Sequence, residues 1–265
     1  MKPITKDNCD FPTLRQSGCI YVDKTRWFVK LATDVQSRMY FLARPRRFGK
    51  SLMISTLKAM FEGRKALFKG LDIMKLGWDW KKKFPVIHLN MGTCAAEDYE
   101  TFAQNLPGMI KDALAGAGVE YDTKETPSRN FGSAIDKLAA KGTPPVILID
   151  EYDDPVAKAL KNVEVAERIR SSLAPIYGQM KDRSGKIRFL MITGVSKFTK
   201  LSIFSTLSSL VDISFEDGYA AMLGYTEDEL DEYFSEHMEA HRKVMGLSFN
   251  GRTRQFKGGV AVAVK

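Results

Sequence analysis

The residues best suited to chemistry stand together in one short stretch, Arg44-Pro45-Arg46-Arg47-Phe48-Gly49-Lys50-Ser51. An apolar run precedes this stretch, and a helical pattern without glycine or proline follows it. Gly49 would let the backbone approach an oxyanion, and the first N–H groups of the helix would point at that anion. Lys50 would add a charge near the outer phosphates, and Ser51 would offer a hydroxyl to magnesium. The pattern predicts a phosphate-binding loop between a strand and a helix.

The contacts expected for a bound nucleotide cover the end of this loop and the first turn of the helix. They are Arg46, Arg47, Phe48, Gly49, Lys50, Ser51 and Leu52. The match to the pattern G-x-x-x-x-G-K-S/T is incomplete, because Arg44 stands where the first glycine would be. A residue other than glycine must keep a negative φ there or accept strain, so we expect a differently shaped loop entry. The alternative is a basic loop that binds no particular anion.

A second informative stretch is an aliphatic run that ends in acids, Val146-Ile147-Leu148-Ile149-Asp150-Glu151. A strand buried on both faces delivers side chains in this way to the carboxyl edge of a parallel sheet. Beside a phosphate loop this is the Walker B arrangement. Asp150 would then hold magnesium together with Ser51, while Glu151 would orient and deprotonate the attacking water.

A third apolar stretch, residues 187–193, leads into Gly194-Val195-Ser196. In ATPases that carry an extra strand between the loop strand and the acidic strand, this position presents a polar residue to the outer phosphate. Thr193 or Ser196 could fill that role, and each is also an ordinary residue for a strand end. The catalytic candidates are therefore Lys50, Glu151, Thr193 and Ser196.

These residues need a sheet to bring them together, and the hydrophobic patterns supply one. Strands are expected at residues 39–43, 84–90, 145–150, 187–193 and 210–215. Helices are expected at residues 97–118 with a break or kink at Pro107-Gly108, at 128–140, and from Pro155 to Arg183 with a bend or interruption at Pro175 and Gly178. The prediction is an α/β fold of the P-loop NTPase type, ASCE class, with helices on both faces of a parallel sheet. We expect the strand order 5-1-4-3-2, by analogy.

Three regions are expected along the chain. Residues 1–222 would form the P-loop ATPase-like domain, 223–245 the start of a helical lid, and 246–265 a poorly specified tail. The segment 1–38 would pack beside the base of a bound nucleotide or simply cap the core. In the lid, Thr226 and Glu229 have the spacing of a helical capping box.

Composition places the chain among ordinary globular proteins, with 265 residues, 44% of them hydrophobic. A net charge of +8 favours contact with phosphates or nucleic acid without demanding it. Three cysteines without paired metal-ligand spacing suggest neither a disulfide framework nor a zinc site. With no signal-peptide core and no run of 18 apolar residues, we expect a cytoplasmic protein without membrane contact.

Some aromatic and histidine residues invite a functional interpretation that a structural one outweighs. Trp78 and Trp80 beside lysines could stack on bases, yet tryptophan docked in the core is the commoner arrangement. His88 lies inside an apolar run and is expected to be a hydrogen-bonded core histidine. His237 and His241 are one helical turn apart without a third ligand, so we expect no metal there.

Several of these motifs together resemble the AAA-ATPase-like family of bacterial proteins. They are Tyr21-Val22-Asp23-Lys24-Thr25, the loop 44–51, Phe84–Asn90, Leu148–Asp153 and Thr193–Phe198. The resemblance covers about residues 1–235 and implies that Arg44 is the family's own form of the loop. Such proteins commonly continue into a PD-(D/E)XK nuclease-like domain. Nothing between Gly246 and Lys265 offers the acids and lysine of such a site, so an effector protein or nuclease domain would act in trans.

The leading hypothesis is a module that binds ATP with Mg²⁺ and hydrolyses it slowly to alter contacts with a partner or effector domain. A second hypothesis is a nucleotide-dependent DNA- or RNA-binding module with little or no hydrolysis, which the positive charge permits. A third is a truncated, inactive fragment. The sequence leaves the choice between ATP and GTP open, as well as the oligomeric state.

Overall fold

A computed structural model describes residues 1–5, 9–196, 207 and 209–245, the last four by their backbone alone. The expected tail at 246–265 and the end of the Thr193–Phe198 motif lie outside the described residues. Among the described residues, no helix is long and apolar enough to cross a bilayer.

The centre of the molecule is a parallel sheet of five strands. The strands are β1 (Met39–Ala43), β2 (Val86–Asn90), β3 (Val146–Asp150), β4 (Phe189–Gly194) and β5 (Val211–Asp212). They lie in the order β2-β3-β4-β1-β5, which read from the other edge is 5-1-4-3-2. The register pairs Ala43 with Gly194 and Asn90 with Asp150, so the strand ends that carry the polar motifs meet at one edge.

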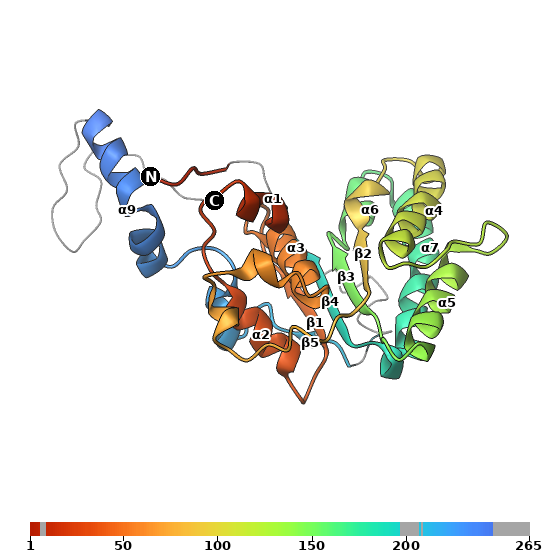
Figure 1. Cartoon of the computed structure of the whole chain (residues 1–265). Helices are drawn as coiled ribbons and strands as arrows, with labels where there is room; N and C mark the ends of the chain where they lie inside the picture. Colours follow the sequence, from red (N-terminus) through yellow and green to blue (C-terminus); the bar gives the residue numbers. More distant parts are fainter. Residues whose placement is uncertain (6–8, 197–206, 208, 246–265) are drawn as a thin grey trace.

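Helices cover both faces of this sheet (Figure 1). On one face lie α4 (Tyr99–Gly116), α5 (Pro127–Ala140), α6 (Asp154–Lys158) and α7 (Val163–Asp182). On the other lie α1 (Phe11–Gln16), α2 (Thr25–Thr33) and α3 (Lys50–Phe61). Alternate strand residues supply the two cores: Ile147 and Ile149 face α4, α5 and α7, whereas Val146 and Leu148 face α3. The expected α/β architecture with both faces covered is confirmed.

Short 3₁₀ helices and one long helix complete the chain. They are η1 (Lys65–Phe68), η2 (Asp72–Met74), η3 (Met91–Thr93), η4 (Ser184–Lys186), η5 (Asp217–Met222) and α9 (Glu227–Met245). The capping box is confirmed, since Glu229 N–H donates to Thr226 Oγ1 at 3.2 Å and Thr226 N–H donates to Glu229 Oε2 at 2.9 Å. α9 extends from the α1–α3 side of the sheet, away from α4, α5 and α7 (Figure 1).

A break is absent at both positions where the sequence predicted either a break or a bend. α4 runs without a break through Pro107, which is tolerable because Ala103, whose carbonyl loses its i+4 donor, is exposed to water. The region after Pro155 does divide, but between α6 and α7 and not at Pro175 or Gly178. The cause is Asn162, whose side chain accepts from Glu164 N–H and Val165 N–H and so starts a new helix.

The fifth strand is much shorter than the expected residues 210–215. Ile213 N–H still donates to Phe41 O at 2.9 Å, but Ala43 N–H donates to the Ser214 hydroxyl at 2.8 Å. Ser214 N–H in turn donates to the Asp212 side chain at 3.0 Å. Because side chains replace the main-chain partners here, the ladder ends at Asp212 although the segment still follows β1.

Trp78 and Trp80 are half-buried and pack against the core. Trp78 meets Phe61 edge-on at 5.4 Å between ring centroids, and Trp80 meets Phe68 at 5.1 Å. These contacts favour the core interpretation over base stacking. The expectation of a hydrogen-bonded His88 is wrong, because its Nε2 is buried without a hydrogen-bond partner among the described residues. Burial lowers the pKa of His88, and the nearby Lys58 ammonium lowers it further.

Candidate phosphate-binding and acidic site

The loop between β1 and α3 has the backbone shape that an anion cradle requires. Gly49, directly before α3, has a φ of 89°, and Arg47 has a φ of 65°. A side-chain-bearing residue pays about 1–2 kcal/mol in this left-handed region, so glycine at 49 is the natural choice. The first N–H groups of α3 follow directly, where an anion is favoured.

Arg44, which stands where the phosphate-loop pattern has its first glycine, anchors the entry of the loop. Its φ is not among the positive values found in the described residues, as expected for a non-glycine. Its N–H donates to Gly194 O at 3.1 Å, and its guanidinium donates to Ser214 O and to Ala43 O. Burial lowers the pKa of Arg44, and Asp212 opposes that effect. Arg44 thus ties the loop entry to β4 and to the segment after β5, on both sides of β1. The left-handed conformation is found at Arg47 instead of at position 44.

Lys50 lies across the loop, with only 7% of its surface exposed. Its ammonium donates to the carbonyl oxygens of Arg44 at 2.8 Å and Pro45 at 2.9 Å. Burial lowers the pKa of Lys50, while the nearby carboxylates of Asp150, Asp153 and Glu151 act to raise it. The structure therefore brings Lys50 to the same edge of the sheet as the turn after β3, residues 151–154, which we call the acidic turn.

Asp150 is the last residue of β3 and is 4% exposed. Its Oδ1 accepts from the hydroxyl of Thr193 at 2.5 Å and from Glu151 N–H at 3.1 Å. Both contacts use the same oxygen, which leaves Oδ2 for another ligand. Of the two candidates for the polar residue that faces the outer phosphate, Thr193 contacts Asp150 directly, whereas Ser196 has an exposed side chain and contacts Asp153 instead.

Glu151 follows Asp150 in a left-handed conformation, with a φ of 54°. Burial raises the pKa of Glu151, and the carboxylates of Asp150 and Asp154 raise it further. The carboxylate lies against Gly92, where an added Cβ would stand 2.6 Å from Glu151 Oε2. A strained residue with a raised pKa at a sheet edge has the features of a general base.

The remaining predicted contacts divide into backbone and charge contributors. Phe48 and Leu52 pack their side chains against the core on the α3 face, so any contact they make with an anion would come from the backbone. Ser51 is half-buried in the first turn of α3. Arg46 and Arg47 are exposed, and Arg46 reaches Asp154 with 3.7 Å between Nη2 and Oδ1.

Four residues of this edge were missed from the sequence: Gly92, Tyr152, Asp153 and Asp154. The signal for the last three was available, because they continue the run that begins with Asp150. Gly92 follows β2, and its closeness to Glu151 depends on a register that no local pattern reveals.

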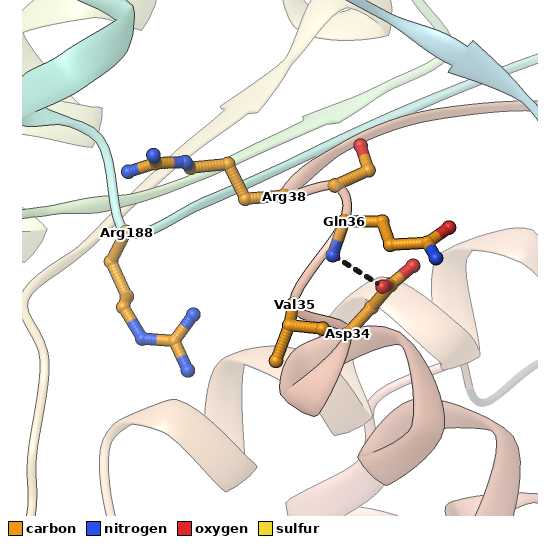
Figure 2. A pocket seen from close by; sticks show the side chains of 6 residues that line it. Asp34, Val35, Gln36, Arg38 and Arg188 are labelled. Atoms are coloured by element: carbon orange, nitrogen blue, oxygen red, sulfur yellow. Dashed lines mark hydrogen bonds between the residues drawn. The ribbon is translucent and has the colours of Figure 1, made fainter.

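Two hollows lie away from the loop. One, of about 220 Å³, is lined by Asp34 to Arg38 together with Arg188 (Figure 2). Arg38 precedes β1 and Arg188 precedes β4, so this hollow lies at the amino ends of the strands, opposite the loop. The other, of about 500 Å³, lies between β2 and α4 and includes His88 and Asn90 in its wall.

The donor set suits a nucleotide with magnesium. Mg²⁺ prefers oxygen ligands and is usually held by one or two protein groups together with phosphates and water. Ser51 and Asp150 offer one hydroxyl and one carboxylate, and the described residues contain no cluster of three or more His, Cys, Asp or Glu residues that would hold a metal alone. The Lys50 ammonium, now on main-chain carbonyls, is of the type that binds outer phosphates.

The fold and this edge define an α/β protein with a five-stranded parallel sheet and a basic, glycine-containing loop before a helix. Residues 8–204 match the family described as "Predicted AAA-ATPase", and the chain belongs to this AAA-ATPase-like family.

A relative carries the same segment within a longer protein. It is described as "Uncharacterized protein in vnfD 5'region" of Azotobacter chroococcum mcd 1 and is 41% identical over 220 residues. The match takes in 81% of this chain and 41% of the relative. The chain thus spans less than half the length of that protein.

Proposed function

We propose that the chain binds Mg-ATP at the carboxyl edge of its sheet and hydrolyses it slowly, in order to regulate a partner or an effector domain. The observation that carries this proposal is the meeting of a buried loop lysine, Lys50, with Asp150 and the strained Glu151. The family's description as a predicted AAA-ATPase supports it. The position of β4 between β1 and β3 supports the ASCE class of P-loop NTPases.

Each residue has a distinct part in this proposal. Lys50 would leave the carbonyls of Arg44 and Pro45 for the outer phosphates, which the N–H groups of Gly49 and the first turn of α3 also bind. Ser51 and Asp150 would hold the metal. Bound Mg²⁺ would neutralise charge on the phosphate oxygens.

Glu151 would take the proton of the attacking water, because its raised pKa makes it a stronger base than an ordinary carboxylate. Thr193 of β4, hydrogen-bonded to Asp150, would respond to whether the outer phosphate is present. Arg46 would move from Asp154 to the phosphates, since its side chain is 77% exposed and little packing restrains it.

The tryptophans give the nucleic-acid alternative little support, since Trp78 and Trp80 pack against the core. For the compartment we propose the cytoplasm, where thiols such as Cys19 and Cys94, which form no disulfide, persist.

Hydrolysis is tested with Glu151→Gln. General bases contribute about 10²–10⁴-fold to rate, so phosphate release should fall by at least about 100-fold while the Kd for ATP stays within about threefold. Glu62→Gln, on the same protein at the end of α3, serves as the control and should release phosphate at the normal rate. Equal phosphate release by the Glu151→Gln variant and the unaltered chain would remove Glu151 from the reaction.

A further inference from the structure

The end of β3 and the turn after it are fastened to the end of β4 by three residues, Asp150, Tyr152 and Asp153. Asp150 Oδ1 accepts from the Thr193 hydroxyl, and Tyr152 N–H donates to Thr193 O at 2.9 Å. Asp153 continues the series, since its carboxylate accepts from Val195 N–H at 3.0 Å. The acidic turn and the segment that carries Thr193 therefore move together.

Ser196 is held from both ends by two neighbouring residues of this turn. Its N–H donates to Asp153 Oδ2 at 3.1 Å, and its carbonyl accepts from the hydroxyl of Tyr152 at 2.9 Å. Asp153 is 3% exposed and Tyr152 is fully buried, so the side-chain partners in these bonds are shielded from water, whereas Ser196 is exposed.

Gly194 makes this close approach achievable. A Cβ at Gly194 would stand 2.5 Å from the ring of Tyr152 and 2.8 Å from Asp153 Oδ1. The ring of Tyr152 also meets Phe41 of β1 edge-on at 5.3 Å, which links the turn to the strand that enters the phosphate loop.

Glu151 stands in the middle of these anchored residues. Its φ of 54° is a conformation that persists only where the surroundings fix it. Asp150 before it and Tyr152 and Asp153 after it are each bonded to residues 193–196, so Glu151 itself cannot relax.

We propose that Asp153 is a positioning residue that holds both Glu151 and the Thr193–Ser196 segment in the arrangement needed for hydrolysis. This inference rests on the proposed function. Asp153 touches neither water nor nucleotide in this account, and it acts through the main chain of Val195 and Ser196.

A merely structural carboxylate would behave differently. Its loss would lower stability and affect nucleotide binding and turnover together. A positioning residue lowers turnover without weakening nucleotide binding. The phosphate loop, from Arg44 to Ser51, forms no hydrogen bond with Asp153 among the described residues, and the Asp153 carboxylate acts on Lys50 through its charge, whose loss would not repel a phosphate.

The experiment compares Asp153→Ala and Asp153→Asn with Asp98→Ala, which removes a carboxylate that accepts one N–H bond at the start of α4, away from this edge. For Asp153→Ala we expect kcat to fall at least about tenfold with the Kd for ATP within about threefold. Asp153→Asn keeps one acceptor oxygen and should recover part of kcat. Asp98→Ala should lower Tm without a selective loss of kcat.

Amide hydrogen exchange supplies a readout that needs no activity. Exchange at Val195 and Ser196 should speed up at least about tenfold in Asp153→Ala, less in Asp153→Asn, and not at all in Asp98→Ala. Unchanged kcat in Asp153→Ala, or parallel losses of kcat, binding and Tm, would overturn the positioning role. If the unaltered chain neither binds nor hydrolyses ATP, the proposed function is wrong and the positioning role is wrong with it. The exchange data would then show only whether the hydrogen bonds from Val195 and Ser196 to Asp153 form.

Discussion

At the scale of single residues, burial pushes the two central charged groups toward their neutral forms. It lowers the pKa of Lys50 and raises the pKa of Glu151. Each group also moderates the other, because the Lys50 ammonium lowers the pKa of Glu151 and the Glu151 carboxylate raises the pKa of Lys50. Phosphates would thus meet a lysine already stripped of water, and the attacking water would meet a carboxylate with enhanced basicity.

This environment predicts the pH dependence of hydrolysis. Only deprotonated Glu151 accepts a proton, so the rate should fall as pH drops through its raised pKa, at a higher pH than for an ordinary glutamate. Asp154→Asn removes one of the charges that raise this pKa and should move the acid limb of the kcat profile to lower pH. An acid limb that stays in place in Asp154→Asn would show that another group controls it.

At the scale of elements, the motif at residues 21–25 fastens α9 to the sheet domain. The ammonium of Lys24 lies 2.6 Å from Glu229 Oε1 and donates to Ala221 O at 2.8 Å, and both members of the ion pair are largely buried. Burial alone would raise the pKa of Glu229, but bonds from Lys24 and Thr226 bring it below the ordinary value. The capping glutamate of α9 is therefore also its anchor.

Removal of one partner should release the helix. Lys24→Met leaves Glu229 buried without its cation, which typically costs about 3–5 kcal/mol, and amide exchange in residues 227–241 should rise accordingly. The double variant Lys24→Met/Glu229→Gln should recover part of the loss, because no charge is then stranded. A double variant as exposed to exchange as the single one would show that the ion pair is not the anchor.

Packing between β4 and the acidic turn predicts a second effect at this scale. In Gly194→Ala the new methyl would overlap the buried ring of Tyr152, so we expect a loss of about 1–3 kcal/mol in thermal unfolding. Gly178→Ala in α7 is the matched control, since its Cβ meets nothing within 4 Å and alanine favours helices. A Gly194→Ala protein that melts with the control would contradict the close contact.

Sequence patterns could predict the elements whose signal is local. The apolar runs at 39–43 and 146–150 can be buried only inside a covered sheet, and both strands are found there. The break before α7 was missed because Asn162 lies inside a continuous amphipathic pattern. The length of β5 was overestimated because the side chain of Ser214 replaces a main-chain hydrogen-bond partner of β1.

The site was predictable in outline for the same reason. Lys50 begins α3, Asp150 ends β3 and Glu151 follows it directly, and strand ends meet at one edge of a parallel sheet. The choice between Thr193 and Ser196 needed the register of β3 against β4, which places Thr193 on Asp150. Gly92 and Asp153 act through contacts between segments far apart in sequence, and local patterns carry no information about those.

At the scale of the whole molecule, the sheet separates two hydrophobic cores and gathers its polar strand ends at one edge. The α1–α3 side carries α9 (Figure 1). Shortly before α9, Gly224 packs on Phe48 of the loop, since a Cβ on Gly224 would stand 3.2 Å from the Phe48 ring. We propose that this contact gives a change at the phosphate loop a short route to α9. That route would serve the proposed regulation of a partner.

The most direct test is equilibrium binding of a fluorescent ATP analogue, with and without magnesium, to the unaltered chain, Lys50→Ala and Lys58→Ala. Lys58 lies two turns along α3 and is the matched control. We predict binding that requires magnesium, weakens at least tenfold in Lys50→Ala, about 1.4 kcal/mol or more, and is unchanged in Lys58→Ala. No binding, or equal binding by the unaltered chain and Lys50→Ala, would contradict a nucleotide site at this loop.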